Sequence, residues 1–536
     1  MSPRIACVLL VLPGAAYAAE NPLARGTGPV IVAPHTGLGA SGIGRLPAQA
    51  AGEEKAISGP TPFVFGCGGI GGTLYLNAEV EPSIRVDPRD PRHWIAAWQQ
   101  DRWSSGSSQG QLTGVTFDAG VTWTRVAPAL SQCAGGEFER ASDPWVDIAP
   151  DGTAHQVTIA STGNLLAARS VSTVLATRSG DGGLTWAAPQ TLIRDTGAFF
   201  NDKETLTADP TDAHLVYVVW DRLQQAASGP TYLARSTDGG VTWEPARAIY
   251  DPGVNQQTIG NVIRVLPDGT LVNLLTHLVG TNERASTATL EVIRSFDHGV
   301  TWSAPVKIAD YLPIGVSDPA THAEVRDGTP VAEMAVGPDG TLYVVWQDGR
   351  FSGTADAIAM ARSGDGGATW TTPVRVSARA DARAFAPQVH VAADGTIAVT
   401  YFDLRFDTPD PASLPCDFWM ARSRDGVSWL ETHLAGPFDL LGAPNAGGLF
   451  LGDYTGLDSA GSELLALHAR TTGSPGNPTD LFVARVATDA PGVAYAASDK
   501  ALATNDAPLR ERAAAALARA MERRPFGWLG RKARPD

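Results

Sequence analysis

The chain of 536 residues is poor in basic side chains: Lys and Arg number 41 against 56 Asp and Glu, which gives a formal net charge of −15. General nucleic-acid binding needs a basic face that neutralises phosphates, so this balance argues against it. Charged residues make up only 18% of the chain and hydrophobic residues 43%. That proportion supplies a large apolar core and excludes global disorder.

Long hydrophobic runs are also missing. Arg4, an apolar run over residues 5–12 and the small-x-small pattern at 16–18 predict a signal peptide, residues 1–18, and hence a secreted or periplasmic protein. After it, no apolar run reaches the roughly 18 residues that a membrane-spanning helix needs. We therefore expect an exported protein without a membrane span, and we expect it to be a monomer.

Cysteine is scarce, with four in the chain. No Cys-x-x-Cys pair or His/Cys cluster indicates zinc, and no cofactor is predicted. Cys7 is lost with the signal peptide. The remaining Cys67, Cys133 and Cys416 allow at most one disulfide in a monomer, and the sequence does not select the pair; Cys67–Cys133 is the one we name.

Glycine and proline, by contrast, are abundant, with 57 and 38 residues, and without a collagen period they favour many short strands. A motif of the form Ser-x-Asp-x-Gly-x-Thr-Trp occurs at 179–186, 236–243, 295–302 and 363–370, with a Thr-headed copy at 116–123 and a shorter one at 423–429. Its central aspartates are Asp118, Asp181, Asp238, Asp297, Asp365 and Asp425. Six copies at similar spacing establish an internal repeat.

The motif predicts a tight turn between two strands. Asp and Ser side chains hydrogen-bond the backbone of such turns, and Gly takes the position with positive φ. The tryptophan is expected to pack between neighbouring sheets. Because the copies are nearly identical, we interpret these aspartates as structural and not as catalytic.

A second repeat precedes each turn motif: a strand, a Pro/Asp/Gly turn and another apolar strand. It begins near Glu81, Asp143, Asp202, Asn261, Glu333, Pro387 and Asp453, which gives seven starts for six turn motifs. Each unit then supplies four strands, one blade of a β-propeller, so the predicted class is all-β. Seven blades are favoured and six are the alternative. The last unit, 453–486, has three strands, and residues 28–34 are predicted to add the fourth and close the ring.

The predicted organisation has four parts: a signal peptide (1–18), an N-terminal segment (19–80) that holds the closing strand, the propeller (81–488) and a tail (489–536). Within the tail, residues 508–524 are rich in Ala and Arg and predict one helix. Residues 526–534 are basic and aromatic. The tail is interpreted as a helix on the propeller surface or a frayed end, with a membrane- or partner-docking peptide as the alternative.

The turn motif resembles the Asp box of bacterial sialidases and other BNR-repeat propellers, over roughly residues 81–429. The resemblance implies an exported glycoside hydrolase, similar to exo-α-sialidases, that removes terminal acidic sugars from glycans. Asp boxes also occur in other glycosidases, in lyases and in receptors without activity, so the motif is more specific for the fold than for the reaction.

The resemblance also implies a catalytic tyrosine. The segment Gly452 to Leu457 is similar to the one that carries the tyrosine of sialidases, which makes Tyr454 the predicted nucleophile. A phenol is a poor nucleophile unless a carboxylate takes its proton, and Glu333 is the predicted base, with Glu204 as the alternative. Asp453 and Glu81 complete the predicted catalytic set.

Arginines that follow the second strands form the predicted substrate clamp. These are Arg102, Arg222, Arg350 and Arg405, and the resemblance favours Arg102, Arg350 and Arg405. Guanidinium groups that converge at one channel mouth would bind a carboxylate bidentately. The alternative is a local Asp–Arg pair in each loop, because Asp101, Asp221, Asp348 and Asp403 lie beside them. Asp143 and Glu204 are the other predicted substrate-binding residues.

Two departures from sialidases keep other functions open. Val80-Glu81-Pro82 stands where sialidases have Arg-Ile-Pro, and the loop 102–109 has no carboxylate for the acid/base role. Acidic residues also crowd the same face, which would repel an anionic sugar. This pattern leaves room for a neutral-sugar glycosidase, in which two carboxylates serve as acid and as base or nucleophile. A propeller that binds glycans or proteins without catalysis, and a polysaccharide lyase using His322 or His390, are the remaining alternatives. No metal is predicted or excluded.

Overall fold

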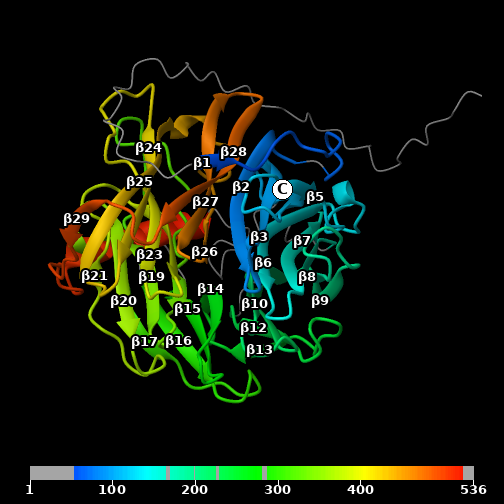
Figure 1. Cartoon of the computed structure of the whole chain (residues 1–536). Coiled ribbons are helices and arrows are strands. Elements are labelled where there is room, and N and C mark those ends of the chain that lie inside the picture. Colours follow the sequence, from blue (N-terminus) through cyan, green and yellow to red (C-terminus); the bar gives the residue numbers. More distant parts are fainter. Residues whose placement is uncertain are drawn as a thin grey trace, which may run out of the picture.

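The computed structural model describes residues 54–69, 71–163, 169–197, 199–224, 228–280 and 287–522. In these residues the regular secondary structure is almost entirely β-strand, with three short 3-10 turns and one helix, α1 (Ala507–Glu522) (Figure 1). The predicted all-β class with a C-terminal helix is confirmed for this part of the chain. None of the described helices has the length and apolar character to cross a membrane. The predicted signal peptide, the predicted strand at 28–34 and the basic segment 526–534 lie outside the described residues.

The described strands form five hydrogen-bonded sheets, one of twelve strands, three of four and one of five. We divide the twelve-stranded sheet where single bridges join it, between β28 and β2 and between β4 and β6, and describe the strands as seven sets with antiparallel pairing between neighbours. The first three sets are β2 (Leu74–Asp87), β3 (Asp90–Trp103), β4 (Ser108–Thr116) and β5 (Thr124–Val126); β6 (Arg140–Ile148), β7 (Ala154–Thr162), β8 (Val171–Ser179) and β9 (Gln190–Thr196); and β10 (Phe199–Ala208), β11 (Val216–Gln224), β12 (Thr231–Ser236) and β13 (Arg247–Tyr250). The next two are β14 (Gln256–Val265), β15 (Leu271–Val279), β16 (Thr287–Ser295) and β17 (Val306–Tyr311); and β18 (Glu333–Val336), β19 (Leu342–Asp348), β20 (Ala357–Ser363) and β21 (Val374–Arg375). Each of these sets has the four strands that the repeat predicts.

The last two sets each gain a strand from elsewhere in the chain. The sixth contains β22 (Phe385–Val391), β23 (Ile397–Asp403), β24 (Pro415–Ser423), β25 (Ser428–Asp439) and, beyond β25, β29 (Val493–Ala496). The seventh contains β26 (Gly456–Ala460), β27 (Glu463–Ser474) and β28 (Asn477–Ala487), and β1 (Glu54–Ala56) pairs with β28. The last unit therefore supplies three strands, as predicted. The strand that adds to it among the described residues is at 54–56, further along the chain than the predicted 28–34.

The first strand of each set lies at the centre of the molecule. β2 contacts β6, and the contacts continue through β10, β14, β18 and β22 to β26, which contacts β2. Figure 1 shows the sheets arranged around this centre. Single bridges, Ala78 to Thr479 and Ser108 to Ala141, also join the seventh set to the first and the first to the second. β2 begins at Leu74, before the boundary at residue 81 that the repeat indicates.

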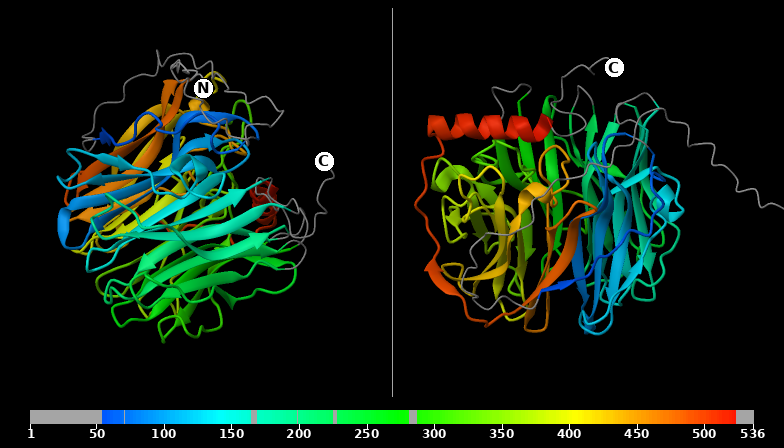
Figure 2. Two further views of the ribbon diagram at one scale, coloured as in Figure 1. Left: turned by 90° about the vertical axis from the view of Figure 1, so that its right-hand side faces the viewer. Right: turned by 90° about the horizontal axis from the view of Figure 1, so that it is seen from above.

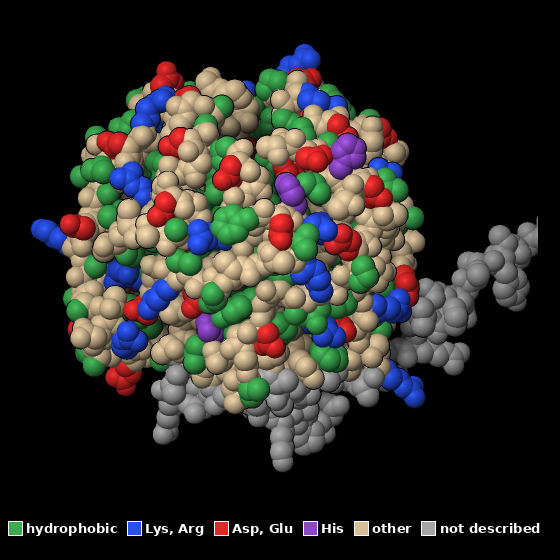
Figure 3. Space-filling model, turned by 90° about the horizontal axis from the view of Figure 1, so that it is seen from below, with side chains coloured by type: hydrophobic (Ala, Val, Ile, Leu, Met, Phe, Trp, Pro, Cys, Tyr) green, Lys and Arg blue, Asp and Glu red, His purple; other side chains and the backbone are tan. Residues whose placement is uncertain are grey.

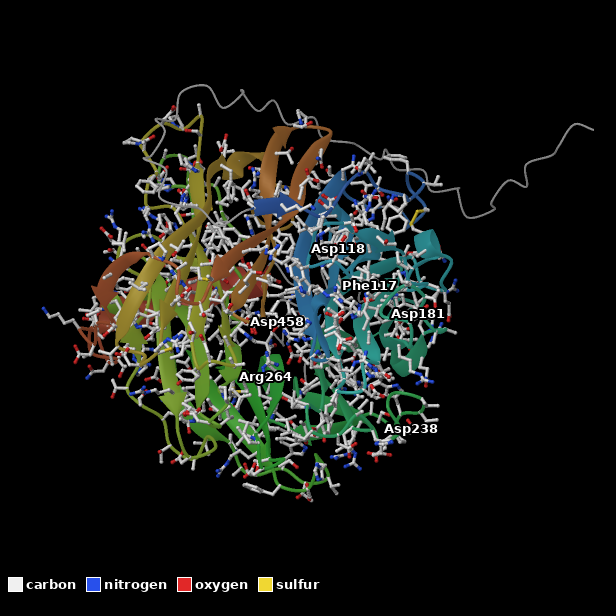
Figure 4. The ribbon with its side chains drawn as sticks, viewed as in Figure 1. Phe117, Asp118, Asp181, Asp238, Arg264 and Asp458 are labelled. Atoms are coloured by element: carbon white, nitrogen blue, oxygen red, sulfur yellow. A yellow bond between two sulfur atoms is a disulfide. The ribbon has the colours of Figure 1, made fainter. Side chains whose placement is uncertain are left out.

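The repeated motif forms the turn after the third strand, which we call the repeat turn. In the third set, Thr242 N and Oγ1 donate to the two carboxylate oxygens of Asp238 at 2.8 and 2.6 Å. Gly240 has a φ of 74°. Trp302, from the fourth repeat turn, packs against Tyr217 and Ile263, which belong to two neighbouring sets. The predicted turn, with its tryptophan between sheets, is confirmed for these copies. Figure 4 labels Asp118, Asp181 and Asp238 in three successive sets.

α1 docks on the sheets through one face. The face is formed by residues four apart, Leu509, Ala513, Leu517 and Met521, all buried. At the start of the helix, Asp506 Oδ1 accepts a hydrogen bond from Leu509 N at 2.9 Å, which satisfies one of the unpaired amides of a helix end. In both views of Figure 2 the helix lies on the face turned away from the viewer of Figure 1. The described helix covers 507–522 of the predicted 508–524, and it lies on the surface of the sheets.

Cys67 and Cys133 form a disulfide, with Cα atoms 5.2 Å apart. The named pairing is therefore confirmed. Cys416 is a buried free thiol in β24. Since disulfides persist in oxidising compartments, the bond is consistent with the expected export.

Candidate functional site

Three first strands carry a charged residue with left-handed backbone at equivalent positions. The φ angle is 53° at Glu81 in β2, 53° at Asp143 in β6 and 51° at Lys203 in β10. Strand pairing shifts register at each of these points. A residue other than glycine in this conformation costs about 1–3 kcal/mol, and a bulge redirects its side chain. The bulges bring the three side chains together near the centre of the molecule.

The ammonium of Lys203 holds three carboxylates. Its Nζ lies 2.7 Å from Asp143 Oδ2, 2.7 Å from Asp453 Oδ2 and 3.3 Å from Glu81 Oε1. The other oxygen of Asp453 accepts a hydrogen bond from Arg326 Nε at 2.9 Å. We call Glu81, Asp143, Lys203, Arg326 and Asp453 the Lys203 cluster.

A second layer of polar groups supports the cluster. Gln99 Nε2 donates to Glu81, and its Oε1 accepts from Arg102 Nη1 at 2.5 Å. The guanidinium carbons of Arg102 and Arg326 lie 4.8 and 4.3 Å from the centre of the Phe450 ring. Two guanidinium groups thus share one aromatic ring beside the carboxylates, at distances that allow cation–π attraction.

The environment pushes the pKa values of two carboxyl groups apart. Burial, and then the charge of Asp143, raise the pKa of Glu81 to about 7. Burial acts on Asp143 too, but the Lys203 ammonium and the Ser142 hydroxyl outweigh it and hold the Asp143 pKa at about 2. Near neutral pH, Glu81 can therefore carry a proton while Asp143 is ionised. Carboxyl groups tuned in opposite directions are a pattern of acid/base sites.

Solvent hardly reaches the cluster. The side chains of Glu81, Asp143, Lys203 and Asp453 are at most 6% exposed, whereas Arg326 is 17% exposed. A bound molecule therefore contacts the carboxylates only when Lys203 or Arg326 moves aside. Arg326 is the most exposed member of the cluster.

Tyr454 lies beside the Lys203 cluster. Its hydroxyl donates to the carbonyl of Pro144 at 3.3 Å, and Lys203 Nζ is 5.7 Å from its ring centre. Burial, followed by the charges of Glu81 and its neighbours, raises the pKa of Tyr454, so the phenol is neutral at physiological pH. Glu204 also contributes to this shift. Its carboxyl group is buried, and neither oxygen has a hydrogen-bond partner among the described residues.

Glu333, the predicted base for Tyr454, belongs to a different group. The charges that act on it come from Arg264 and Arg85, and Gln388 hydrogen-bonds it. Burial outweighs these interactions and raises its pKa to about 7. Of the two predicted bases, the structure therefore brings Glu204, and not Glu333, into the electrostatic surroundings of Tyr454.

Three of the four predicted clamp arginines are held by carboxylates. Arg350 Nε and Nη2 each lie 2.8 Å from an oxygen of Asp348. Arg405 Nε donates to Asp403 at 2.7 Å, and its Nη atoms donate to Glu431. These two positions form the local Asp–Arg pairs of the alternative interpretation.

The other two arginines differ. Arg222 pairs with Asp195, a residue of the preceding set, and not with the adjacent Asp221. Arg102 contacts Gln99 and has no carboxylate within salt-bridge distance among the described side chains. The structure therefore leaves Arg102 and the unpredicted Arg326 as the arginines closest to the acidic cluster.

Sequence reasoning missed the two cations of the cluster. Lys203 occupies the position in its strand that Glu81 and Asp143 occupy in theirs, so an alignment of the first strands, residue by residue, would have found it. Arg326 comes from the long segment between β17 and β18, which has no counterpart in the other repeats. No repeat signal points to it.

The predicted histidines lie apart from the cluster. His322 is exposed in a loop. His390 lies in β22, with Nε2 2.8 Å from Ser459 Oγ. Within the described ranges, no three His, Cys, Asp or Glu side chains are arranged to hold a metal ion.

Comparisons with known proteins give no family for this chain. No family model matches it, and no curated protein matches it. Among solved structures, it is similar to a protein of unknown function from Dyadobacter fermentans, at 14% identity and a TM-score of 0.42, over 77% of this chain and 96% of that one. It is similar to a Hadza microbial sialidase at 16% identity and a TM-score of 0.43, over 74% and 76%. It is also similar to an α-L-arabinofuranosidase from Fusarium graminearum at 12% identity and a TM-score of 0.42, over 66% and 93%.

Proposed function

We propose that the seven sets are the blades of a closed seven-bladed propeller. The contacts of the first strands run from β2 to β26 and back to β2, and they support a closed ring. The pairing of β1 with β28 supports a last blade completed from the N-terminal side of the chain. Closing the ring in this way would remove an exposed strand edge.

We propose that the protein is an exported glycoside hydrolase that removes terminal sugars from glycans, with Glu81 and Asp143 as the catalytic pair. The observation that carries this proposal is the contact of both carboxyl groups with one ammonium, combined with pKa values of about 7 and about 2. Such a pair holds one carboxylic acid and one carboxylate at the same pH. Glycosidases use this combination to break a glycosidic bond.

The proposed reaction proceeds in two steps. Protonated Glu81 donates its proton to the leaving oxygen as the bond from that oxygen to the anomeric carbon breaks, and Asp143 forms a covalent bond to the same carbon. Ionised Glu81 then takes a proton from water, whose oxygen displaces Asp143. Enzymes of this type hold the two carboxyl groups about 5–5.5 Å apart, a spacing that fits two groups in contact with one ammonium. Lys203 keeps Asp143 ionised.

An acidic-sugar substrate would involve a different set. Tyr454 would be the nucleophile, Glu204 or Glu333 its base, and Arg102 with Arg326 the clamp for the substrate carboxylate. The two guanidinium groups that share Phe450 support this version. This version differs from the Glu81–Asp143 version in two respects: the substrate carries a negative charge, and Tyr454 must lose its proton to act as the nucleophile.

A panel of chromogenic glycosides tests the proposal; it includes a sialoside, an α-L-arabinofuranoside and neutral pyranosides. We expect turnover of at least one neutral glycoside, and loss of at least 1000-fold in kcat in Glu81→Gln and Asp143→Asn (~4 kcal/mol). The matched control is Asp195→Asn, which alters a carboxylate paired with Arg222 outside the cluster. If wild type and Asp143→Asn turn over a substrate equally, the assignment is wrong.

Binding of glycans without catalysis is the second candidate. The burial of the cluster favours it, because carboxylates with at most 6% exposure and complete salt bridges resemble a structural ion network. Binding to a glycan array, with no turnover of any glycoside in the panel, would select this function.

Export and a glycan partner complete the proposal. The Cys67–Cys133 disulfide supports an oxidising compartment. On the side of the molecule that Figure 3 shows, the basic and acidic side chains of the described residues are interspersed and form no broad basic area. That distribution, with the net charge of −15, supports a partner other than nucleic acid.

A further inference from the structure

A separate cavity of about 310 Å³ lies in the centre of the molecule and is lined by residues of all seven first strands. Its lining includes Pro88, Pro150 and Pro210, which follow the ends of β2, β6 and β10. β2 and β4 run in the same direction because both pair antiparallel with β3. The cavity therefore lies at the end of the strands where the repeat turns are. The residues of the Lys203 cluster come earlier in their strands than the lining residues do, and none of them lines the cavity.

The cavity presents two arginines and two aspartates from four different strands. Arg85 Nε lies 3.2 Å from Asp147 Oδ1. Arg264 donates from Nε to the carbonyl of Met334 at 2.8 Å, and within the described chain no carboxylate lies within salt-bridge distance of it. Asp458 faces the same space from β26, and Figure 4 shows Arg264 and Asp458 near the centre of the ring. Donors and acceptors thus alternate around one small volume.

The formal charges of this cavity nearly cancel. Among the lining side chains, Arg85 and Arg264 are balanced by Asp147 and Asp458, and burial lowers the pKa of His390, which is then neutral at pH 7. Glu333 does not line the cavity, but it interacts with both arginines and adds negative charge when it is ionised. A strongly charged ligand would therefore gain little here. Neutral hydroxyl groups, which both donate and accept, can bind arginine and aspartate in turn.

The walls and the volume limit the ligand further. Apolar residues, among them Trp145 and Leu457, also line the cavity beside the polar groups. About 310 Å³ is at the lower end of the roughly 300–1,000 Å³ of small-molecule sites, which fits one ring and not an oligosaccharide.

We propose that this cavity is a second sugar site, which binds one neutral monosaccharide unit through Arg85, Arg264, Asp147 and Asp458. It lies further along the first strands than Glu81 and Asp143, towards the repeat turns, and it has no part in the proposed reaction. The inference goes beyond the proposed function and does not depend on it. Occupancy would give the propeller a binding site for free sugar or a terminal glycan residue on the face of the repeat turns.

Isothermal titration of the full chain with glucose, galactose, N-acetylglucosamine and arabinose, with glucuronate as the charged comparator, tests the site. Ala335→Phe fills the cavity without removing a polar group, and Arg264→Met removes the donors that no carboxylate pairs with. The matched control is Arg235→Met, which alters an arginine that pairs with Glu244 outside the cavity. Glu81→Gln tests whether sugar binding involves the proposed catalytic carboxyl groups.

We expect at least one neutral monosaccharide to bind wild type with millimolar or tighter affinity. Ala335→Phe should abolish binding, and Arg264→Met should weaken it at least tenfold, while Arg235→Met and Glu81→Gln bind as wild type does. Circular dichroism shows whether each variant is folded. If one of the two cavity variants does not fold, the binding measured with the other cavity variant tests the site. The site is refuted if no neutral sugar binds, if glucuronate binds more tightly than every neutral sugar, or if the folded cavity variants bind like wild type. Because binding is measured without turnover, an inactive protein that still binds sugar refutes only the proposed function.

Discussion

Lys203 Nζ lies 2.7 Å from Asp143 Oδ2, and both side chains are almost completely buried at the register shifts of β10 and β6. The same nitrogen contacts Glu81 and Asp453. One ammonium therefore balances much of the negative charge that β2, β6 and the segment before β26 bring together. This relationship explains how three carboxylates can lie close together in a buried region of the chain.

Replacing Lys203 by an uncharged residue should destabilise the protein. Lys203→Met leaves the carboxylates buried without their shared cation, so we expect the free energy of unfolding to fall by about 3–5 kcal/mol. Lys307→Met is the matched control, because Lys307 Nζ also lies 2.7 Å from a carboxylate, that of Asp310, but its side chain is 53% exposed. An exposed pair contributes only about 0–1 kcal/mol. Urea denaturation measures both; equal losses would contradict the role of Lys203.

The stability of the protein should fall with rising pH as Glu81 loses its proton. Its pKa is about 7 in the folded protein and 4.5 ordinarily, so the folded state binds the proton more tightly. The resulting stabilisation is present below pH 4.5 and is lost as the pH rises through 7, by about 3 kcal/mol. The lowered pKa of Asp143 acts between pH 2 and 3.8, with the opposite sign.

Urea denaturation at pH 5, 6, 7 and 8 tests this. Glu81→Gln should reduce the decline in stability across that range relative to wild type. Glu333 contributes a decline of its own, since its pKa is also about 7, and it is present in both proteins. Glu137→Gln, at a carboxylate that is 60% exposed, is the control and should change nothing. A decline that survives unchanged in Glu81→Gln would show that this carboxyl group does not titrate in the range.

The repeat explains why so much of the fold followed from the sequence. A turn motif with a fixed Asp, Gly and Trp dictates local hydrogen bonds, and these are present at Asp238. The site was less predictable. The position of Glu81 could be read from the repeat, but the partner of each charge could not, because Arg222 reaches Asp195 in the preceding set and not its neighbour Asp221. Arg326 lies in a segment outside the repeat, so only the folded chain shows its contact with Asp453.

Asp238→Ala should cost stability and leave any activity intact. The substitution removes two hydrogen bonds from Thr242, each worth about 0.5–1.5 kcal/mol. The lost hydrogen bonds lie in a repeat turn, away from the proposed catalytic pair. Asp499→Ala, at an exposed position near the C-terminal helix, is the control. Thermal melting should separate the two variants, and a variant that melts normally but has lost turnover would contradict the structural role.

α1 should contribute to the stability of the sheets that it covers. Leu517 is 1% exposed and packs into the same cluster as residues of β14 and β16, so Leu517→Ala should cost about 2 kcal/mol or more. Leu502→Ala, at a leucine that is 40% exposed, should cost less than about 0.5 kcal/mol. A chain that ends before residue 508 should still fold, with a lower melting temperature. If it does not fold, the helix belongs to the obligatory core and not to an added layer.

Tyr454→Phe distinguishes the two versions of the proposed reaction. The substitution keeps the ring beside Trp145 and removes only the hydroxyl that donates to Pro144, so the melting temperature should change little. In the version with Glu81 and Asp143 as the catalytic pair, we expect kcat to fall by less than tenfold, while Glu81→Gln loses at least 1000-fold. In the tyrosine version the order reverses, because the nucleophilic oxygen is gone and no nearby group replaces it. Initial rates with a neutral glycoside and with a sialoside, measured for wild type and both variants, distinguish the two versions. If Tyr454→Phe retains turnover of the substrate that wild type cleaves, Tyr454 is a packing residue of the site.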